Sequence, residues 1–278
     1  MKLGLFTSGY MRNPIEDMFA DAREYGYDYI ELWGGRPHAY APDLHDGQVR
    51  DIRALSEKYE MPILGYTPEH NAYPYNYMLG SEAQREDAVA YLKLCIDMAK
   101  EMGAEFVLTS PANGGYQATY RELWERLLTT IQELGDYAAS REIKLMVEPL
   151  TPYESNFFTR ANDLVELIER VDNPWVVGMC DVVPPFVQHE SIMAYFDKLG
   201  DKVNHMHIID GEKAAATHII PGEVVMPLRE MLCELKRIGY TGSATLELVT
   251  TYMNEPRFYA RRAIDNMHAL MRQADWEI

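Results

Sequence analysis

The stretch LMVEPLTPYES, residues 145–155, starts as an apolar run and stops abruptly on a glutamate, Glu148, which a proline follows. A short run rich in aliphatic residues is typical of a buried β-strand. A carboxylate at the end of such a strand is costly to bury unless a cation or a set of hydrogen-bond donors satisfies it. The stretch therefore predicts a buried strand whose end carries part of a functional site.

Seven further apolar runs resemble this one, so the sequence predicts eight strands in all. The others are LGLFT (3–7), YIELW (29–33), PILGYT (62–67), EFVLTS (105–110), WVVGMCDVV (175–183), VNHMHIID (203–210) and SATLELV (243–249). Amphipathic helical patterns lie between and after them, at 14–25, 47–60, 82–102, 119–140, 160–171, 191–199, 228–238 and 256–272. Two of these helices have a capping pattern at their start, formed by Asn13 with Glu16 and by Ser81 with Gln84.

Strict alternation of strand and helix, with almost continuously apolar strands, favours a parallel sheet closed into a (β/α)8 TIM barrel. A doubly wound open sheet is the alternative. No linker or low-complexity segment divides the chain, so we predict a single α/β domain over residues 1–278. In such barrels the loops that follow the strands carry the chemistry.

The amino-acid composition restricts the classes of molecule that the protein can be expected to bind. The 43 acidic residues outnumber the 26 basic ones, and the resulting net charge of −17 makes nucleic acid a poor ligand. No apolar run reaches the roughly 18 residues of a membrane-spanning helix, and MKLGLFTSGY at the start lacks a signal-peptide pattern. We therefore expect a cytoplasmic protein without a membrane partner, and the three widely separated cysteines are expected to be free thiols.

Four consecutive predicted strands each end on a residue type that binds metal ions: Glu148, Asp181, His207 and Glu247. Inward side chains at one height of a barrel converge on its axis. Three carboxylates and an imidazole there would be stabilised by one divalent ion, and this donor set suits Mn(II), with Co, Fe, Mg, Zn and Ni as alternatives. Taken singly, each residue also fits a structural role as a turn cap, a core histidine or an edge charge.

Two further residues lie close to these in sequence. His205 precedes His207 by two positions, so it shares the same strand face one layer deeper, where it supports the ligand or simply belongs to the core. Glu154 follows Pro152 on a stiff loop, where it is a candidate for holding a substrate hydroxyl, with an exposed loop charge as the alternative.

Longer motifs carry a family resemblance over essentially the whole chain. They are ELWGGRPHAYAPDL (31–44), GYTPEHNAYPYN (65–76), EPLTPYESN (148–156), YFDKLGDK (195–202), MPLREM (226–231) and LELVTTYMNEPRFYAR (246–261). On these motifs the chain resembles the xylose isomerase-like TIM barrels of sugar epimerases and isomerases. The resemblance implies that Glu148, Asp181, His207 and Glu247 bind one divalent ion, and that Glu148 and Glu247 form the catalytic acid/base pair. It also implies inversion at C3 of a ketose linked to lysine, through an enediolate.

The chain departs from the related ketohexose 3-epimerases at two positions. Pro184 stands where they have a histidine, and His218 stands where they have an arginine. The family resemblance assigns both positions to substrate contact, so His218 is a candidate contact and a free ketohexose becomes a less suitable substrate. A 3-epimerase or isomerase of a free ketose, of tagatose, psicose or hydroxypyruvate type, is the alternative function.

Aromatic and polar residues of the early loops are candidates for substrate binding. Phe6, Trp33 and Tyr66 would pack on the C–H face of a sugar or else fill the core. The polar candidates for the ends of an aminoalkyl chain are Arg36, His38, Glu69 and His70.

More remote alternatives are a sugar-binding module without catalysis and an apurinic endonuclease-like phosphoesterase, which the acidic charge disfavours. The apolar face of the helix at 256–272 predicts a homo-oligomer.

Overall fold

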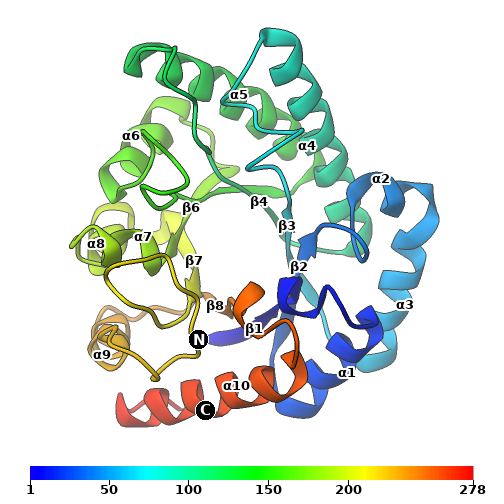
Figure 1. Ribbon diagram of the computed structural model, residues 1–278, viewed down its shortest axis with the longest axis vertical. Helices are drawn as coiled ribbons and strands as arrows, with labels where there is room; N and C mark the ends of the chain where they lie inside the picture. The colour runs from blue at the N-terminus through cyan, green and yellow to red at the C-terminus, as the bar shows by residue number, and fades with distance from the viewer. Residues whose placement is uncertain (278) are drawn as a thin grey trace.

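The computed structural model describes residues 1–277, in which eight parallel strands close into a barrel in sequential order (Figure 1). The strands are β1 Lys2–Phe6, β2 Tyr29–Gly34, β3 Ile63–Pro68, β4 Phe106–Thr109, β5 Lys144–Val147, β6 Val176–Asp181, β7 Val203–Ile208 and β8 Ser243–Leu246. Pairing of β1 with β8 closes the ring, with Gly4 opposite Thr245. The predicted barrel is therefore confirmed, and the open sheet is wrong.

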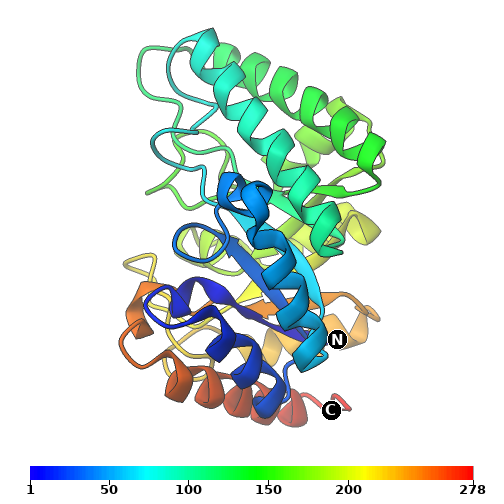
Figure 2. The same ribbon diagram turned by 90° about the vertical axis from the view of Figure 1, so that its right-hand side faces the viewer.

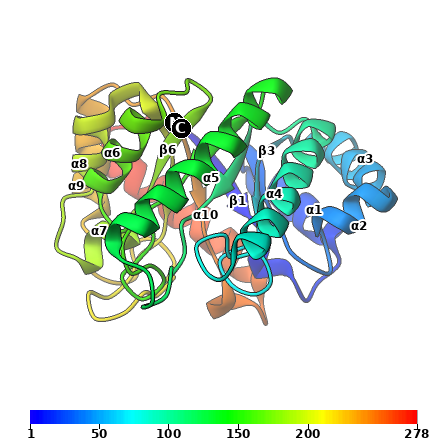
Figure 3. The same cartoon turned by 90° about the horizontal axis from the view of Figure 1, so that it is seen from above.

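Helices form a ring around the strands, and the long helices α4 and α5 lie side by side (Figures 1 and 3). The helices are α1 Ile15–Tyr25, α2 Ala41–Asp43, α3 Val49–Tyr59, α4 Glu82–Met102, α5 Tyr120–Arg141, α6 Ala161–Val171, α7 Val183–Val187, α8 Met193–Leu199, α9 Leu228–Arg237 and α10 Pro256–Gln273. Short turns of 3-10 or π type complete the pattern at η1 Thr7–Tyr10, η2 Leu44–Gln48, η3 Gly200–Lys202 and η4 Thr250–Tyr252. The two shortest α-helices, α2 and α7, carry too few residues to show an amphipathic period, and the sequence patterns did not predict them.

One of the two predicted helix caps is present. Ser81 and Gln84 form a reciprocal capping box at the start of α4. The cap predicted at Asn13 is wrong, because α1 begins after Pro14 without a side-chain cap. The carboxylate of Glu16 instead accepts a hydrogen bond of 2.8 Å from Tyr59 and pairs with Lys58, so α1 is tied to α3 rather than capped by its own first turn.

Side chains that point into the barrel form layers. One group of inward side chains is apolar and consists of Phe106, Leu108, Met146 and Met179. Because side chains alternate along a strand, the residues two positions beyond Met146 and Met179 are Glu148 and Asp181, which lie on the same inward face one layer higher. The apolar group thus lies beneath a polar layer inside the barrel. The main core lies between the strands and the surrounding helices.

Most of the longer loops lie at the end of the barrel where the strands finish, and both chain ends lie at the other end (Figure 2). These loops follow β3, β4, β5 and β7 and span 69–81, 110–119, 148–160 and 209–227. They surround the polar layer and form the walls of its opening. Among residues 1–277, none of the helices has the length and hydropathy needed to cross a membrane.

The C-terminal helix α10 uses most of its apolar face within the chain. Ile264, Met267 and Met271 are buried, and α10 packs beside α1 and α9 (Figure 1). Phe258 differs, since 60% of it is exposed. The broad face that predicted a homo-oligomer is therefore mostly covered by the chain itself, and oligomerisation stays a prediction.

Candidate metal centre

Glu148, Asp181, His207 and Glu247 meet at the open end of the barrel. Asp181 ends β6 and pairs in register with His207 on β7, while Glu148 and Glu247 come directly after β5 and β8. The Nδ1 atom of His207 lies 3.5 Å from Oε1 of Glu148 and 3.7 Å from Oε1 of Glu247. The structure thus brings together the four residues that the sequence predicted as ligands.

A buried glutamate fixes the orientation of His207. Its Nε2–H donates to Oε1 of Glu31 over 2.9 Å, so the other ring nitrogen, Nδ1, faces the carboxylates and carries the lone pair whenever the imidazole is neutral. Within residues 1–277, Nδ1 of His207 is buried and has no hydrogen-bond partner. A lone pair that is buried, oriented and unpartnered among carboxylates is what a metal-binding imidazole presents before the ion binds.

Glu31, on β2, holds this network in place. Besides His207 it accepts hydrogen bonds from His205 over 3.0 Å and from the hydroxyls of Thr67 and Thr245, each over 2.6 Å. Burial disfavours the charge of Glu31, yet the two imidazoles hold its pKa well below the ordinary value. His205 thus supports the ligand histidine through Glu31, and its own Nδ1 accepts from Ser243 over 2.7 Å.

Glu31 was not predicted from the sequence as a site residue. The signal in the sequence is a single charged residue inside the apolar run YIELW. As for Glu148, burial of such a charge requires a cation or a set of hydrogen-bond donors. Glu31, His205 and His207 also lie close enough together to hold an ion. Their facing atoms are already bonded to one another, however, so the unpartnered Nδ1 on the other side of His207 is the better candidate for binding an ion.

Hydrogen bonds also orient Glu148. The hydroxyl of Ser110 donates to its Oε2 over 2.9 Å, and the backbone N–H of Ser110 donates to Nε2 of His70 over 2.9 Å. The Nδ1–H of His70 in turn donates to the carbonyl of Pro68 over 2.7 Å. Burial lowers the pKa of His70, which keeps this imidazole neutral and lets it accept from Ser110. His70 therefore connects β3 to the position of Glu148.

Asp181, Glu247 and His218 lie on the other side of the site, with one ligand atom of each within 4.8 Å of the others. Nε2 of His218 lies 3.1 Å from Oε2 of Glu247. Burial opposes the charge of His218, but Glu247 and Asp181 outweigh it and raise the pKa of His218 to about 9. Burial and the charges of Glu247 and Glu148 raise the pKa of Asp181 well above its usual value. A bound cation would relieve this repulsion, so the donor set fits a divalent ion.

The site opens into a cavity of about 220 Å³. Of the residues predicted to contact substrate, six line it: Phe6, Trp33, Glu69, His70, Glu154 and His218. Phe6 packs against His207 with 5.6 Å between ring centroids. Glu154 is held at the mouth because its Oε2 accepts from the hydroxyl of Thr151 over 2.7 Å.

Three other predicted contacts lie elsewhere. Tyr66 is fully buried and donates to the carbonyl of Ala39 over 2.7 Å. Its neighbour Thr67 points into the barrel towards Glu31, so alternation directs Tyr66 outwards to the helices. Arg36 pairs with Asp43, and Nε2 of His38 lies 2.7 Å from the carbonyl of Asn13. The expectation that Tyr66 packs on a substrate therefore does not agree with its position.

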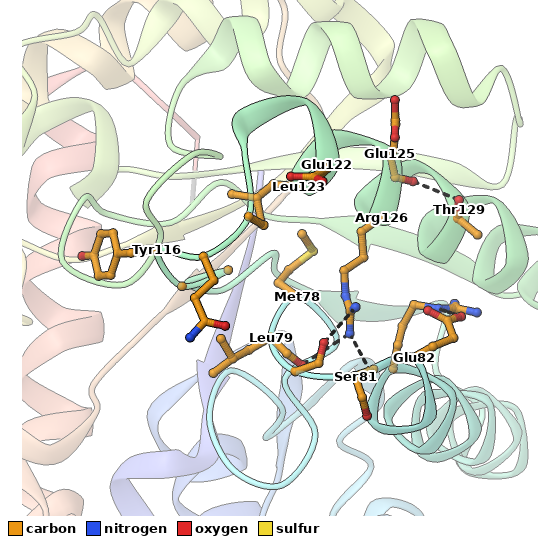
Figure 4. A pocket seen from close by; sticks show the side chains of 16 residues that line it. Met78, Leu79, Ser81, Glu82, Tyr116, Glu122, Leu123, Glu125, Arg126 and Thr129 are labelled. Carbon is orange, nitrogen blue, oxygen red and sulfur yellow. Dashed lines mark hydrogen bonds and ion pairs between the residues drawn. The ribbon is translucent and has the colours of Figure 1, made fainter.

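A larger groove of about 900 Å³ lies between the start of α4 and the start of α5, along the loops that follow β3 and β4 (Figure 4). Its central cation, Arg126, donates to the backbone carbonyls of Tyr77, Leu79, Gly80 and Ser81. Arg126 thus holds the loop in place rather than facing outwards as a binding group. None of the four ligand residues lines this groove.

Comparisons with known proteins agree with this fold. The family model described as xylose isomerase-like TIM barrel matches residues 19–270. A curated relative, the fructoselysine 3-epimerase of Shigella flexneri, is 52% identical over 271 residues, which cover 98% of this chain and 98% of the relative.

Solved structures share the fold at low sequence identity. A structure of L-ribulose 3-epimerase matches with a TM-score of 0.83 and 15% identity, covering 99% of this chain and 96% of the other. The IOLI protein, solved with a zinc atom, matches with a TM-score of 0.81 and 17% identity over 100% of both chains.

Proposed function

The chain belongs to the xylose isomerase-like TIM barrel family and is a sugar 3-epimerase, and we propose that it interconverts fructoselysine and its C3 epimer, psicoselysine. The proposal for this substrate rests on the 52% identity to the fructoselysine 3-epimerase of Shigella flexneri over 98% of both chains. The matched region spans 98% of both chains and so includes the loops, which carry the chemistry in barrels of this kind.

We propose that Glu148, Asp181, His207 and Glu247 hold one divalent ion. The observation that carries this step is the buried, unpartnered Nδ1 of His207, which faces Glu148 and Glu247 at 3.5 and 3.7 Å. Three oxygen donors and one nitrogen favour Mn(II), with Co, Fe, Mg, Zn and Ni as alternatives. When bound, the ion supplies a Lewis acid that stabilises the negative charge developing as the substrate loses its C3 proton.

Glu148 and Glu247 would move the proton. Epimerisation requires removal of a proton from one face of C3 and its return to the opposite face of the planar enediolate, which two bases on different sides achieve more readily than one. The two glutamates follow β5 and β8, three strands apart, and the Oε1 atoms of Glu148 and Glu247 lie 3.5 and 3.7 Å from Nδ1 of His207. One acts as base and the other as acid, and the roles exchange when the reaction runs backwards.

Neighbouring residues prepare each glutamate for this role. Ser110 donates to Oε2 of Glu148, and the imidazole of His218 contacts Oε2 of Glu247, so in each carboxylate Oε1 is the atom nearer to His207. Phe6, Trp33 and Leu108 line the cavity with apolar surface that limits access of water to the reacting carbon.

The test is an assay with purified, metal-loaded protein. Fructoselysine in deuterated water should give psicoselysine with deuterium at C3.

The alternative, a free ketose substrate, is favoured by the cavity volume of about 220 Å³, which lies below the roughly 300–1,000 Å³ of typical ligand pockets. Turnover of free psicose or tagatose with much higher kcat/KM than fructoselysine would support the alternative. A cytoplasmic location and a homo-oligomeric state remain predictions.

A further inference from the structure

The loop between β7 and α9 is organised around one buried carboxylate. Asp210, which follows β7, is only 1% exposed. Its Oδ1 accepts hydrogen bonds from the backbone N–H groups of Gly211 over 2.8 Å and of Met226 over 2.9 Å. Its Oδ2 accepts from the N–H groups of Gly222 over 3.0 Å and of Val224 over 2.9 Å. Because each carboxylate oxygen can accept two hydrogen bonds, all four backbone donors are satisfied by this one side chain.

The main chain of Asp210 closes the same loop. Its N–H donates to the carbonyl of Ile219 over 2.7 Å, and the N–H of Ile219 donates back over 2.9 Å. His218 directly precedes Ile219, so these two bonds fix the backbone beside the imidazole. Nε2 of His218 lies 3.1 Å from Oε2 of Glu247. The side chain and the main chain of Asp210 together therefore determine where His218 meets Glu247.

The outer side of the loop is fastened to the segments that follow β8. The N–H of Ile220 donates to the hydroxyl of Tyr252, in η4, over 3.1 Å. The side-chain amide of Asn266, in α10, donates to the carbonyl of Pro221 over 3.0 Å. Glu247 lies between β8 and η4, on the same stretch of chain. The loop is thus held from both sides, with a buried carboxylate within and the end of the chain outside.

We propose that Asp210 is a positioning residue, which holds His218 against Glu247 and so sets the orientation of that carboxylate. This inference rests on the proposed function for the role of Glu247 as one of two bases. Asp210 is not among the described residues that line the cavity, so it acts through His218 and not on the substrate. Its effect should fall on Glu247 and spare Glu148, which a separate hydrogen bond from Ser110 orients.

Replacement of Asp210 by asparagine would disturb this arrangement with almost no change in size. The amide keeps one accepting oxygen, but its NH2 group would face two backbone N–H groups that cannot accept a hydrogen bond. Two buried donors then lose their partner, so the loop must move to reach other acceptors or water. The contact of 3.1 Å between His218 and Glu247 would be lost with the backbone that supports it.

Amide hydrogen exchange followed by mass spectrometry tests the hold on the loop without turnover. The proteins compared are the metal-loaded wild type, Asp210→Asn and the matched control Asp21→Asn. Asp21 is also a fully buried, hydrogen-bonded carboxylate, but it lies on α1. We expect faster exchange of residues 209–227 in Asp210→Asn alone. Wild-type exchange of this loop in Asp210→Asn would overturn the inference.

A double-mutant cycle tests the route through the histidine. The kcat/KM of Asp210→Asn should fall by about 10–100-fold, the range seen when supporting residues are altered. The double variant with His218→Ala should stay within about twofold of His218→Ala itself, because both changes remove the same contact. Metal content should stay near that of the wild type, since neither residue is a proposed ligand. Additive losses, or an equal loss in Asp21→Asn, would contradict the inference.

A second variant serves if Asp210→Asn does not fold. Gly222 has a φ of 82°, which an alanine adopts only with strain. An added Cβ would meet Leu270 at 3.6 Å, an ordinary contact, so Gly222→Ala acts on the turn and leaves the side chain of Asp210 in place. It should raise amide exchange in the same loop, and an unchanged loop together with wild-type kinetics would count against the inference.

Exchange of the C3 hydrogen with solvent deuterium, started separately from fructoselysine and from psicoselysine, shows which base is affected. In Asp210→Asn the ratio of the two exchange rates should shift in the same direction as in Glu247→Gln and opposite to Glu148→Gln. An equal fall from both epimers would mean that Asp210 has only a general structural role. Wild-type protein without C3 exchange would refute the proposed function, whereas unchanged amide exchange of the loop overturns the inference whatever the substrate.

Discussion

Nε2 of His207 lies 2.9 Å from Oε1 of Glu31, and this bond determines which nitrogen of the histidine faces the three carboxylates of the site. Glu31 comes from β2 and His207 from β7, on distant parts of the chain. The contact therefore ties the early half of the barrel to the ligands contributed by the late half. Its effect is to direct Nδ1, the nitrogen that is free to bind an ion when the imidazole is neutral, towards Glu148 and Glu247.

Replacement of Glu31 by glutamine should weaken metal binding by roughly 10–100-fold, the range seen when groups that support a ligand are altered. The amide offers one acceptor where the carboxylate offers two, so the preferred tautomer of His207 is lost. Metal titration followed by elemental analysis measures the effect. Glu142→Gln, an exposed glutamate at the end of α5, is the control, and equal affinities in both variants would show that Glu31 does not orient the ligand.

Removal of the metal should lower the melting temperature as well as abolish activity. Without a cation, the buried carboxylates of Glu148, Asp181 and Glu247 repel one another, which is reflected in the raised pKa of Asp181. Ion at about 100 times its Kd should stabilise the native state by about 2.7 kcal/mol. Thermal unfolding of chelator-treated and Mn-loaded protein tests this. Full activity in protein shown to be metal-free would contradict the metal assignment.

Ser110→Ala should reduce kcat/KM by about tenfold or more, because Oε2 of Glu148 loses the hydroxyl that donates to it over 2.9 Å. Metal content should stay near that of the wild type, since Ser110 is not a ligand. Ser140→Ala, which removes an exposed hydroxyl on α5, is the matched control. Wild-type kinetics in Ser110→Ala would mean that Glu148 is positioned by its strand alone.

A further prediction concerns the ion pair between α10 and α1, far from the site. Arg257 of α10 donates to both oxygens of Asp21, a fully buried residue of α1, over distances of 2.7 to 3.1 Å. Arg257→Ala removes the charged donor of that carboxylate while the hydrogen bond from the hydroxyl of Tyr10 remains, and should cost about 1–3 kcal/mol of unfolding free energy. Arg229→Ala, which breaks an exposed pair, should cost about 0–1 kcal/mol. Denaturant unfolding of both variants makes the comparison, and equal stabilities would contradict the prediction.

The barrel could be predicted because each strand is a short apolar run and the alternation with helices is regular. The four metal-type residues could be predicted because each comes at the end of its run, where a single side chain stands out. Glu31 could not be identified in this way, since it lies inside β2 and a lone charge within a strand does not reveal which strand lies across the barrel. Its partners become visible only when His205, His207, Thr67 and Thr245 are brought together in space.

The assignment of Tyr66 shows a different limit. In the run PILGYT, Tyr66 and Thr67 point to opposite faces, and the run is apolar enough that either face could be the inner one. A large aromatic residue near a strand end favours the prediction of a substrate contact. The structure places the smaller Thr67 inside, where it donates to Glu31, and Tyr66 outside among the helices. The sequence pattern alone does not show which of the two faces points into the barrel.

The most direct test of the central claim is exchange of the C3 hydrogen in Glu148→Gln and Glu247→Gln, each loaded with metal. Each variant should lose epimerisation by about 10² to 10⁴, the usual contribution of one positioned base. One variant should still exchange the C3 hydrogen of fructoselysine with solvent deuterium without inverting it, while the other exchanges only that of psicoselysine. If both metal-loaded variants epimerise at near wild-type rates, the two glutamates are not the acid/base pair.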